Sequence, residues 1–213
     1  MNKWLDPVVD SYRKYFGLSG HPTVWDVGSR DGRDGFELMK RISSDLRAEL
    51  NSKLVLIEPN PTQAEKIAET YPKATVYQLA IADRPGIEKF KVYHGNEGDV
   101  GSSSLHMDWK KGSGLRSHII EVQVVRLDEL VDKETIDIMK IDVEGYGYQA
   151  LLGLGEKLDQ VRVLHIETEH ESKSDVKVKA YLEKRGWIIT DITEQWGGMP
   201  DITAVNANPV SLK

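Results

Sequence analysis

The sequence predicts an α/β fold in which helices cover both faces of a doubly wound, mainly parallel sheet. Two short apolar runs, Val24 to Val27 and Leu54 to Ile57, have the composition of buried parallel strands. The first run leads into the glycine-rich turn Gly28 to Gly32, and apolar residues at helical spacing follow each run. A chain of 213 residues, 39% of them hydrophobic, suits a single domain spanning residues 1–213.

The first elements alternate between helix and strand. The N-terminal segment, residues 1–20, carries apolar side chains at helical spacing from Pro7 to Phe16 and is expected to cover a sheet edge or the mouth of a ligand site. Strands are expected at Thr23 to Val27 and at Lys53 to Ile57. After the second strand, Asn60 can cap a helix whose first residue is a proline.

The middle of the chain departs from this alternation. Thr75 to Ile81 is expected to form the third strand, and an edge hairpin is expected around residues 87–125, where Ile87 to Tyr93 and Ile119 to Val125 alternate like paired strands. Between them, residues 94–118 are rich in glycine and serine and too long for an ordinary connection. We interpret this segment as a candidate lid or substrate loop.

The last third of the chain returns to strands and helices. The expected elements are strands at Ile136 to Ile141 and Val161 to Ile166, helices at Tyr148 to Leu154 and Ser174 to Arg185, and an antiparallel strand pair at Trp187 to Thr193 and Ile202 to Val205. In the second helix, Val176, Ala180, Tyr181 and Leu182 are expected to face inward, with Gly186 ending the helix.

Charge and composition limit the function classes. The chain carries 28 Lys and Arg against 34 Asp and Glu, and this net charge of -6 argues against a broad nucleic-acid-binding surface. It has no cysteine, which excludes disulfides, thiolate metal ligands and a cysteine nucleophile. The sequence has neither a signal-peptide pattern nor a window near the ~20 apolar residues of a membrane span, so we expect a cytoplasmic protein. Its oligomeric state is left open.

Acidic side chains gather where the expected strands end. Four strands end in or near an acid: Asp26, Glu58, Asp142 with Glu144, and Glu167 with Glu169. Because the carboxyl ends of parallel strands face one crevice, these acids are expected at one edge of the sheet. Like charges repel one another, so their clustering favours a site over ordinary strand-end polarity. A structural ion-pair network that includes Lys140 is the alternative.

The glycine spacing disfavours a dinucleotide ligand. Gly28, Gly32 and Gly35 are spaced G-x-x-x-G-x-x-G, and Arg30 stands where the second glycine of G-x-G-x-x-G would approach a pyrophosphate. Glu58, at the end of the second strand, is placed to accept hydrogen bonds from both hydroxyls of a ribose. Its alternative is a surface acid before a proline turn. Together the turn and Glu58 predict a ribose-bearing cofactor.

Several short motifs follow one another in order between Val24 and Val205. They are Asp26 to Gly32, Ile57 to Asn60, Leu79 to Asp83 with Gly86, Ser102 to Leu105, Val125 to Asp128, Lys140 to Gly145, and Ile166-Glu167 with His170. In this order the chain resembles the FkbM-like branch of class I S-adenosylmethionine-dependent methyltransferases. Arg30 stands where that family often has a glycine, and Gly147 where it commonly has an acid or a larger residue.

The resemblance implies a Rossmann-like sheet of seven strands in the order 3-2-1-4-5-7-6, with the last hairpin antiparallel. It implies S-adenosylmethionine as the cofactor, S-adenosylhomocysteine as the product, and methyl transfer to a hydroxyl group. The implied acceptor is a sugar or a natural-product-like small molecule or glycan, and no nucleic-acid partner is expected.

The resemblance also implies a role for individual residues. Glu58 is expected to bind the ribose, Asp83 and the Ala80-Ile81 backbone the adenine, and Gly28 and Gly32 the methionine portion, whose amino group Asp142 borders. The full set of expected cofactor-binding residues is Asp26, Gly28, Arg30, Gly32, Glu58, Pro59, Ala80, Ile81, Asp83 and Asp142. The expected catalytic residues are Asp142, Glu144, Glu167 and His170.

Other readings of these residues stay open. A nicotinamide-dependent oxidoreductase would bind NAD(H), and a non-catalytic module would keep the cofactor pocket without an acceptor site. Asp142, Glu144, Glu167 and His170 have the donor atoms for a divalent metal, but no metal-binding spacing motif supports one, and we expect no metal ligands.

Overall fold

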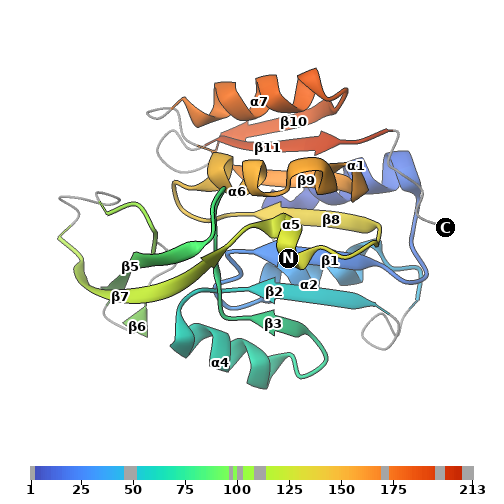
Figure 1. The fold of residues 1–213 in the computed structure, drawn as a ribbon. Coiled ribbons are helices and arrows are strands. Elements are labelled where there is room, and N and C mark those ends of the chain that lie inside the picture. Colours follow the sequence, from blue (N-terminus) through green and yellow to red (C-terminus); the bar gives the residue numbers. More distant parts are fainter. Residues whose placement is uncertain are drawn as a thin grey trace.

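The chain folds around one large sheet (Figure 1). The structure, a computed structural model, describes residues 3–45, 52–95, 98–99, 103–107, 114–168, 173–194 and 200–207. Within these residues seven strands form a sheet of order β10-β11-β9-β8-β1-β2-β3. The strands are β1 (Thr23–Val27), β2 (Lys53–Ile57), β3 (Thr75–Tyr77), β8 (Ile136–Ile141), β9 (Val161–Glu167), β10 (Ile188–Glu194) and β11 (Pro200–Val205). Numbered along the chain, this is the predicted order 3-2-1-4-5-7-6.

The strand directions also agree with the prediction. β1, β2, β3, β8 and β9 are parallel, and β11 is antiparallel to both β9 and β10. The last hairpin therefore supplies the one reversed strand among these seven described strands. Because the parallel strands end at a common edge, the acids that follow β2 and β8 meet there with Glu167, the last residue of β9.

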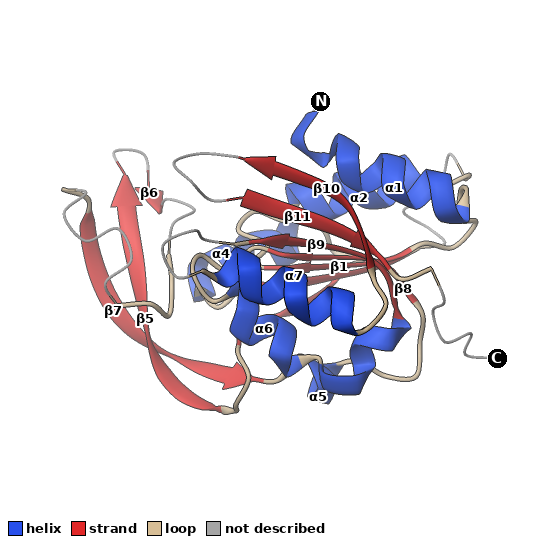
Figure 2. Ribbon diagram, turned by 90° about the horizontal axis from the view of Figure 1, so that it is seen from above, coloured by secondary structure: helices blue, strands red, loops and turns tan. Residues whose placement is uncertain are grey.

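Helices cover both faces of this sheet (Figure 2). On one face lie α1 (Asp6–Phe16), α2 (Arg33–Ile42) and α4 (Pro61–Thr70). On the other lie α5 (Leu127–Leu130), α6 (Gly147–Gly153), the 3₁₀ turn η2 (Gly155–Gln160) and α7 (Ser174–Lys184). A short 3₁₀ turn, η1 (Lys3–Leu5), precedes α1. The helix α1 packs across β9 and β11 on a sheet face, so the sheet edge, one of its two predicted positions, is wrong.

The alternation of side chains along each strand separates the two cores. Trp25 and Val27 point toward α5, α6 and α7, whereas Val24 points toward α1 and α2. Asp26 is two residues after Val24 on the same strand, so its side chain also lies on the α1–α2 face of the sheet.

The expected third strand is split between two sheets. It stops at Tyr77, and Ala80–Ile81 forms a separate strand, β4, that pairs with β7. The second sheet has the order β4-β7-β5-β6, with β5 (Gly86–Gly95), β6 (Gly98–Asp99) and β7 (Arg116–Val125). The predicted hairpin is thus confirmed as an antiparallel pair, but it belongs to its own sheet, which projects to the left in Figure 1.

The segment predicted as a loop at residues 94–118 is shorter than expected, because β5 continues to Gly95 and β7 begins at Arg116. Its described part includes Ser104, which exchanges two backbone hydrogen bonds with Lys91 of β5. The remainder lies outside the described residues, so its role as a lid stays a prediction.

The inward face predicted for α7 is wrong in part. Leu182 is buried and Tyr181 half-buried, but Val176 is 61% exposed and Ala180 is also exposed. The buried partner of Leu182 is Val178. Residues four positions apart share a helix face, whereas Val176 and Val178 point in nearly opposite directions.

Candidate active site

The turn after β1 joins three strand ends. The Gly28 amide donates to the Ile57 carbonyl oxygen at 2.9 Å, and the Asp142 amide donates to the Val27 carbonyl oxygen at 2.9 Å. Gly28 has a φ of +83°, and a Cβ atom there would lie 1.8 Å from the backbone oxygen of Asp142. Only glycine fits this position, because both the backbone conformation and the close approach exclude a side chain.

Glu58 is a buried carboxylate whose orientation is fixed by two backbone amides. Its Oε2 accepts a hydrogen bond from the Arg30 amide at 3.0 Å, and its Oε1 accepts one from the Asn60 amide at 2.8 Å. Asn60 caps α4 as predicted, because its side chain accepts a hydrogen bond from the Thr62 amide at 3.1 Å. The carboxylate therefore links the turn after β1 and the start of α4 to the end of β2.

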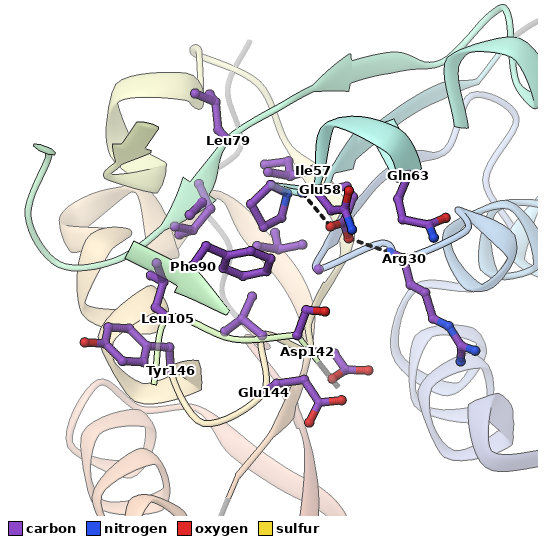
Figure 3. A pocket seen from close by; sticks show the side chains of 18 residues that line it. Arg30, Ile57, Glu58, Gln63, Leu79, Phe90, Leu105, Asp142, Glu144 and Tyr146 are labelled. Carbon is purple, nitrogen blue, oxygen red and sulfur yellow. Dashed lines mark hydrogen bonds between the residues drawn. The ribbon is translucent and has the colours of Figure 1, made fainter. Parts of the chain in front are cut away.

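Arg30 keeps the backbone geometry of a glycine. Its φ is +54°, in the left-handed region that glycine adopts easily and other residues rarely do. This conformation directs the Arg30 amide to Glu58, while its side chain points away from the apolar side chains of the pocket (Figure 3). Arg30 thus adopts a left-handed backbone conformation that a glycine would adopt easily at this position.

A pocket lies between the strand ends and the second sheet (Figure 3). Its polar side carries the carboxylates of Glu58, Asp142 and Glu144. Its apolar wall includes Ile57, Leu79, Ile81, Phe90, Leu105 and Tyr146. Such a pocket suits a ligand with one apolar ring and several hydrogen-bonding groups.

Most of the predicted cofactor residues line this pocket. They are Gly28, Arg30, Glu58, Pro59, Ala80, Ile81 and Asp142. Gly32 instead packs against Leu56 and Tyr71. Asp83 lines a separate recess, where its carbonyl oxygen accepts a hydrogen bond from Arg126 at 2.8 Å.

Asp26 is fully buried away from the pocket lining. Its Oδ2 accepts a hydrogen bond from the Gly35 amide at 2.9 Å, and its Oδ1 lies 3.3 Å from Lys140 Nζ. Burial raises the pKa of Asp26, against the opposing effect of Lys140. In this position Asp26 ties the start of α2 to the sheet.

A polar row crosses the sheet on the α1–α2 face. Asp26, Lys140, His165 and Thr203 are successive cross-strand neighbours on β1, β8, β9 and β11. Lys140 is buried, and its Nζ also lies 3.1 Å from Asp142 Oδ2. Burial alone would lower the pKa of Lys140, but the charges of Asp142 and Asp26 outweigh it and hold that pKa well above its ordinary value.

His165 is the neutral member of this row. Burial, helped by the charge of Lys140, lowers the pKa of His165 to about 3. Its Nδ1 forms a hydrogen bond with Thr203 Oγ1 at 3.0 Å. His165 is thus a packed strand residue.

Asp142 and Glu167 form a hydrogen-bonded carboxyl pair. Burial and the charges of Asp142 and Glu144 raise the pKa of Glu167 far above its ordinary value. Burial also acts against the charge of Asp142, but Lys140 outweighs it and lowers the pKa of Asp142. The opposite directions of these two pKa shifts favour the arrangement in which Glu167 holds the proton of its hydrogen bond to the Asp142 carboxylate.

Two close contacts hold the segment between these acids. The Ser104 hydroxyl donates to the carbonyl oxygen of Glu144, whose φ is +48°. A Cβ atom on Gly147 would lie 2.5 Å from the backbone oxygen of Glu167. The second departure from the family pattern, Gly147, therefore has a physical reason, because β9 passes too close for a side chain.

Some residues of the site were not predicted from the sequence, and some predicted residues lie outside the part of the chain that the structure describes. Gln63, Phe90 and Tyr146 line the pocket without having been predicted. Gln63 lies in the first turn of α4, the helix that follows Glu58, but Phe90 comes from the second sheet and no spacing links it to β2. Glu169 and the predicted catalytic residue His170 lie outside the described residues.

Two further features concern only the described ranges. There, no three or more histidine, aspartate and glutamate side chains are grouped so as to hold a metal ion. No helix in the same ranges is long and apolar enough to cross a membrane.

The sheet order and the pocket at its strand ends are those of an S-adenosylmethionine-dependent methyltransferase, with S-adenosylmethionine as the cofactor. A family model described as "Methyltransferase FkbM domain" matches residues 26–189. The chain therefore belongs to the FkbM methyltransferase family. A search of curated proteins finds no match.

Solved structures share the fold at low sequence identity. Ribosomal protein L11 methylase from Lactobacillus delbrueckii subsp. bulgaricus has a TM-score of 0.52 and 10% identity over 97% of this chain and 80% of its own. A candidate rRNA methylase from Clostridium thermocellum has a TM-score of 0.55 and 8% identity, covering 95% and 94%. Aeropyrum pernix fibrillarin, solved with natively bound S-adenosyl-L-methionine, has 0.50 and 12%, covering 88% and 67%. At these identities the likeness concerns the fold alone.

Proposed function

We propose that this methyltransferase acts on a hydroxyl group of a small-molecule or glycan acceptor, such as a sugar or a natural-product-like scaffold. The observation that carries the cofactor assignment is the buried Glu58 carboxylate, held by two amides inside a pocket with an apolar wall. The observation that favours an oxygen acceptor is the group of acidic side chains at Asp142, Glu144 and Glu167 beside that pocket.

The residues of the pocket fit the cofactor. Glu58 presents a fixed carboxylate that can accept hydrogen bonds from a ribose diol, and Leu79, Ile81 and Phe90 offer an apolar wall for a purine ring. Asp142 is charged and placed to attract an ammonium group. When bound, S-adenosylmethionine supplies a methyl group that its sulfonium has already activated.

The acids beside the pocket have two different roles in this proposal, orientation of Asp142 and acceptance of a proton. Glu167 already carries a proton and donates it in a hydrogen bond to Asp142, so it orients Asp142 and does not act as a base. We assign proton acceptance to the Glu144 carboxylate, which takes the acceptor hydroxyl's proton as the new C–O bond forms. Alignment and exclusion of water account for most of the remaining rate enhancement in this proposal.

Calorimetric titration with S-adenosylmethionine, S-adenosylhomocysteine and NADH tests the cofactor map. We expect the first two to bind and NADH not to bind. Glu58→Ala should weaken binding of both by about tenfold or more, because it removes hydrogen bonds to a charged acceptor. Glu65→Ala, which removes an exposed acid from α4, is the matched control and should leave both affinities unchanged. Binding of NADH alone would instead favour the oxidoreductase.

Methyl transfer to hydroxyl-bearing acceptors tests the catalytic part. Glu144→Gln should lower kcat and leave the affinity for S-adenosylhomocysteine within about twofold, since a base acts on the reacting proton and not on cofactor binding. Cofactor binding without methyl transfer to any glycoside, polyol or phenol would favour the non-catalytic module.

A further inference from the structure

A second, charged recess adjoins the cofactor pocket. It has a volume of about 290 Å³ and shares Gly28, Arg30, Asp142 and Glu144 with the pocket. Its other walls come from η1, from the turn before α2, and from the ends of β8 and β9. The two cavities therefore meet at the acids that the proposed function places beside the reacting atoms.

The floor of this recess is formed by one member of the polar row described above, Lys140. Lys140 lines it, but Asp26 and Asp142 hold the Lys140 ammonium group at 3.3 and 3.1 Å. Asp34 lies 3.9 Å from the same nitrogen. The positive charge of Lys140 is thus compensated within the protein.

Trp4 forms a wall over this floor. Its ring centroid lies 5.6 Å from Lys140 Nζ and 5.7 Å from the His165 ring. The neighbouring Leu5 is fully buried and anchors η1 to the core. Trp4 itself is only half-buried and lines the recess, so part of the indole is available to a ligand.

Carboxylates outnumber cations around the recess. They are Asp31, Asp34, Asp142 and Glu144, against Arg30, Arg33 and Lys140, and Glu167 is left out because it holds the proton of its pair with Asp142. Two of these three cations are already paired with acids: Lys140 as described above, and Arg33, which lies 3.5 Å from Asp31. An entering phosphate or carboxylate would meet like charges at short range, which disfavours its binding.

We propose that this recess is the acceptor subsite and that Trp4 determines its specificity by stacking on an uncharged or cationic ring while the surrounding carboxylates exclude anionic acceptors. The inference rests on the proposed function, because it needs the cofactor in the adjoining pocket. An acceptor subsite with this preference would distinguish this chain from proteins that act on the phosphate backbone of a nucleic acid.

The test follows the Trp4 indole N–H signal by NMR in protein saturated with S-adenosylhomocysteine, with Trp4→Phe assigning the signal. The probes are benzyl alcohol, benzylammonium and benzoate, which share a ring and differ in charge. We expect the first two to shift the signal, and benzoate to bind at least about fivefold more weakly. Asp31→Asn removes one negative charge but keeps an oxygen acceptor, so it should reduce the difference in affinity between benzoate and benzyl alcohol. Benzoate binding as tightly as benzyl alcohol, or no response of Trp4 to any probe, would overturn the proposal.

A calorimetric control separates this proposal from the cofactor assignment. Trp4→Ala should bind S-adenosylhomocysteine within about twofold of the unmodified protein, since Trp4 does not line the cofactor pocket. If Trp4→Ala lost as much affinity as Glu58→Ala, the indole would belong to the cofactor site and the proposal would fail. If S-adenosylhomocysteine did not bind the unmodified protein, the proposed function would fail first.

Discussion

Gly28 is the residue at which the strand ends leave the least room. Gly28→Ala should cost about 3–5 kcal/mol of unfolding free energy, because the methyl group would overlap the Asp142 carbonyl oxygen in a left-handed backbone. Gly186→Ala is the matched control, since Gly186 ends α7 with a φ of +78° and has no neighbour within 4 Å. It should cost only the ~1–2 kcal/mol of the left-handed conformation. Urea unfolding measures both, and equal losses would contradict the close packing at Gly28.

His165 couples stability to pH. Its pKa is about 3 in the folded protein and about 6.5 in the unfolded chain, so between these values only the unfolded state binds the proton. The stability it contributes is therefore fully present above pH 6.5 and is lost as the pH falls toward 3. Between pH 7 and pH 5 this one group should remove about 2 kcal/mol from the unfolding free energy.

A variant isolates this contribution. His165→Gln keeps a polar group beside Thr203 but does not titrate, so its unfolding free energy should fall by about 2 kcal/mol less between the two pH values. Urea unfolding at pH 7 and pH 5 checks this. An unchanged pH dependence in His165→Gln would show that other groups cause the loss.

Among the elements, α7 offers a direct test of which helix face is buried. Val178→Ala should destabilise the protein by about 2 kcal/mol, because it removes buried methyl groups and leaves a cavity. Val176→Ala makes the same chemical change at an exposed position of the same helix and should stay within about 0.5 kcal/mol. Thermal or urea unfolding compares them, and the reverse ranking would restore the face predicted from the sequence.

The elements that the sequence predicts well are those whose signals are local. Buried parallel strands are continuous apolar runs, and Asn60 before a proline is a local cap signal, so β1, β2, β8, β9 and the start of α4 follow from the residues alone. The break of the third strand at Tyr77 depends on pairing with β7, which is distant in sequence. Local periodicity carries no information about such a pairing.

The same limit applies to the acids of the site. Asp26 and Glu58 both close apolar runs, yet Asp26 lies inside β1 and Glu58 follows β2. The alternation along β1 already separates Asp26 from Trp25 and Val27. That Asp26 meets Lys140, and not a ligand, depends on the register between β1 and β8, which the sequence does not reveal.

For the whole molecule, the site depends on the junction between two sheets. The large sheet supplies Glu58 and Asp142 from its strand ends, and the second sheet supplies Phe90. Ser103 and Leu105 come from the segment that bridges back to β5, with Ser104 paired to Lys91. A ligand in this pocket must therefore contact both the large sheet and the second sheet, whose strands make few contacts with each other.

Cofactor binding should consequently stabilise the second sheet against local opening. At about 100 times Kd, S-adenosylhomocysteine contributes about 2.7 kcal/mol, so amides of β5 that exchange only when the pocket opens should exchange about a hundredfold more slowly. Hydrogen exchange with and without S-adenosylhomocysteine measures this, and Glu58→Ala at the same ligand concentration should show little change. Slower exchange in β1, β2 and β8 alone would mean that the ligand contacts only the large sheet. Protection that reaches β5 would show that the cofactor joins the two sheets.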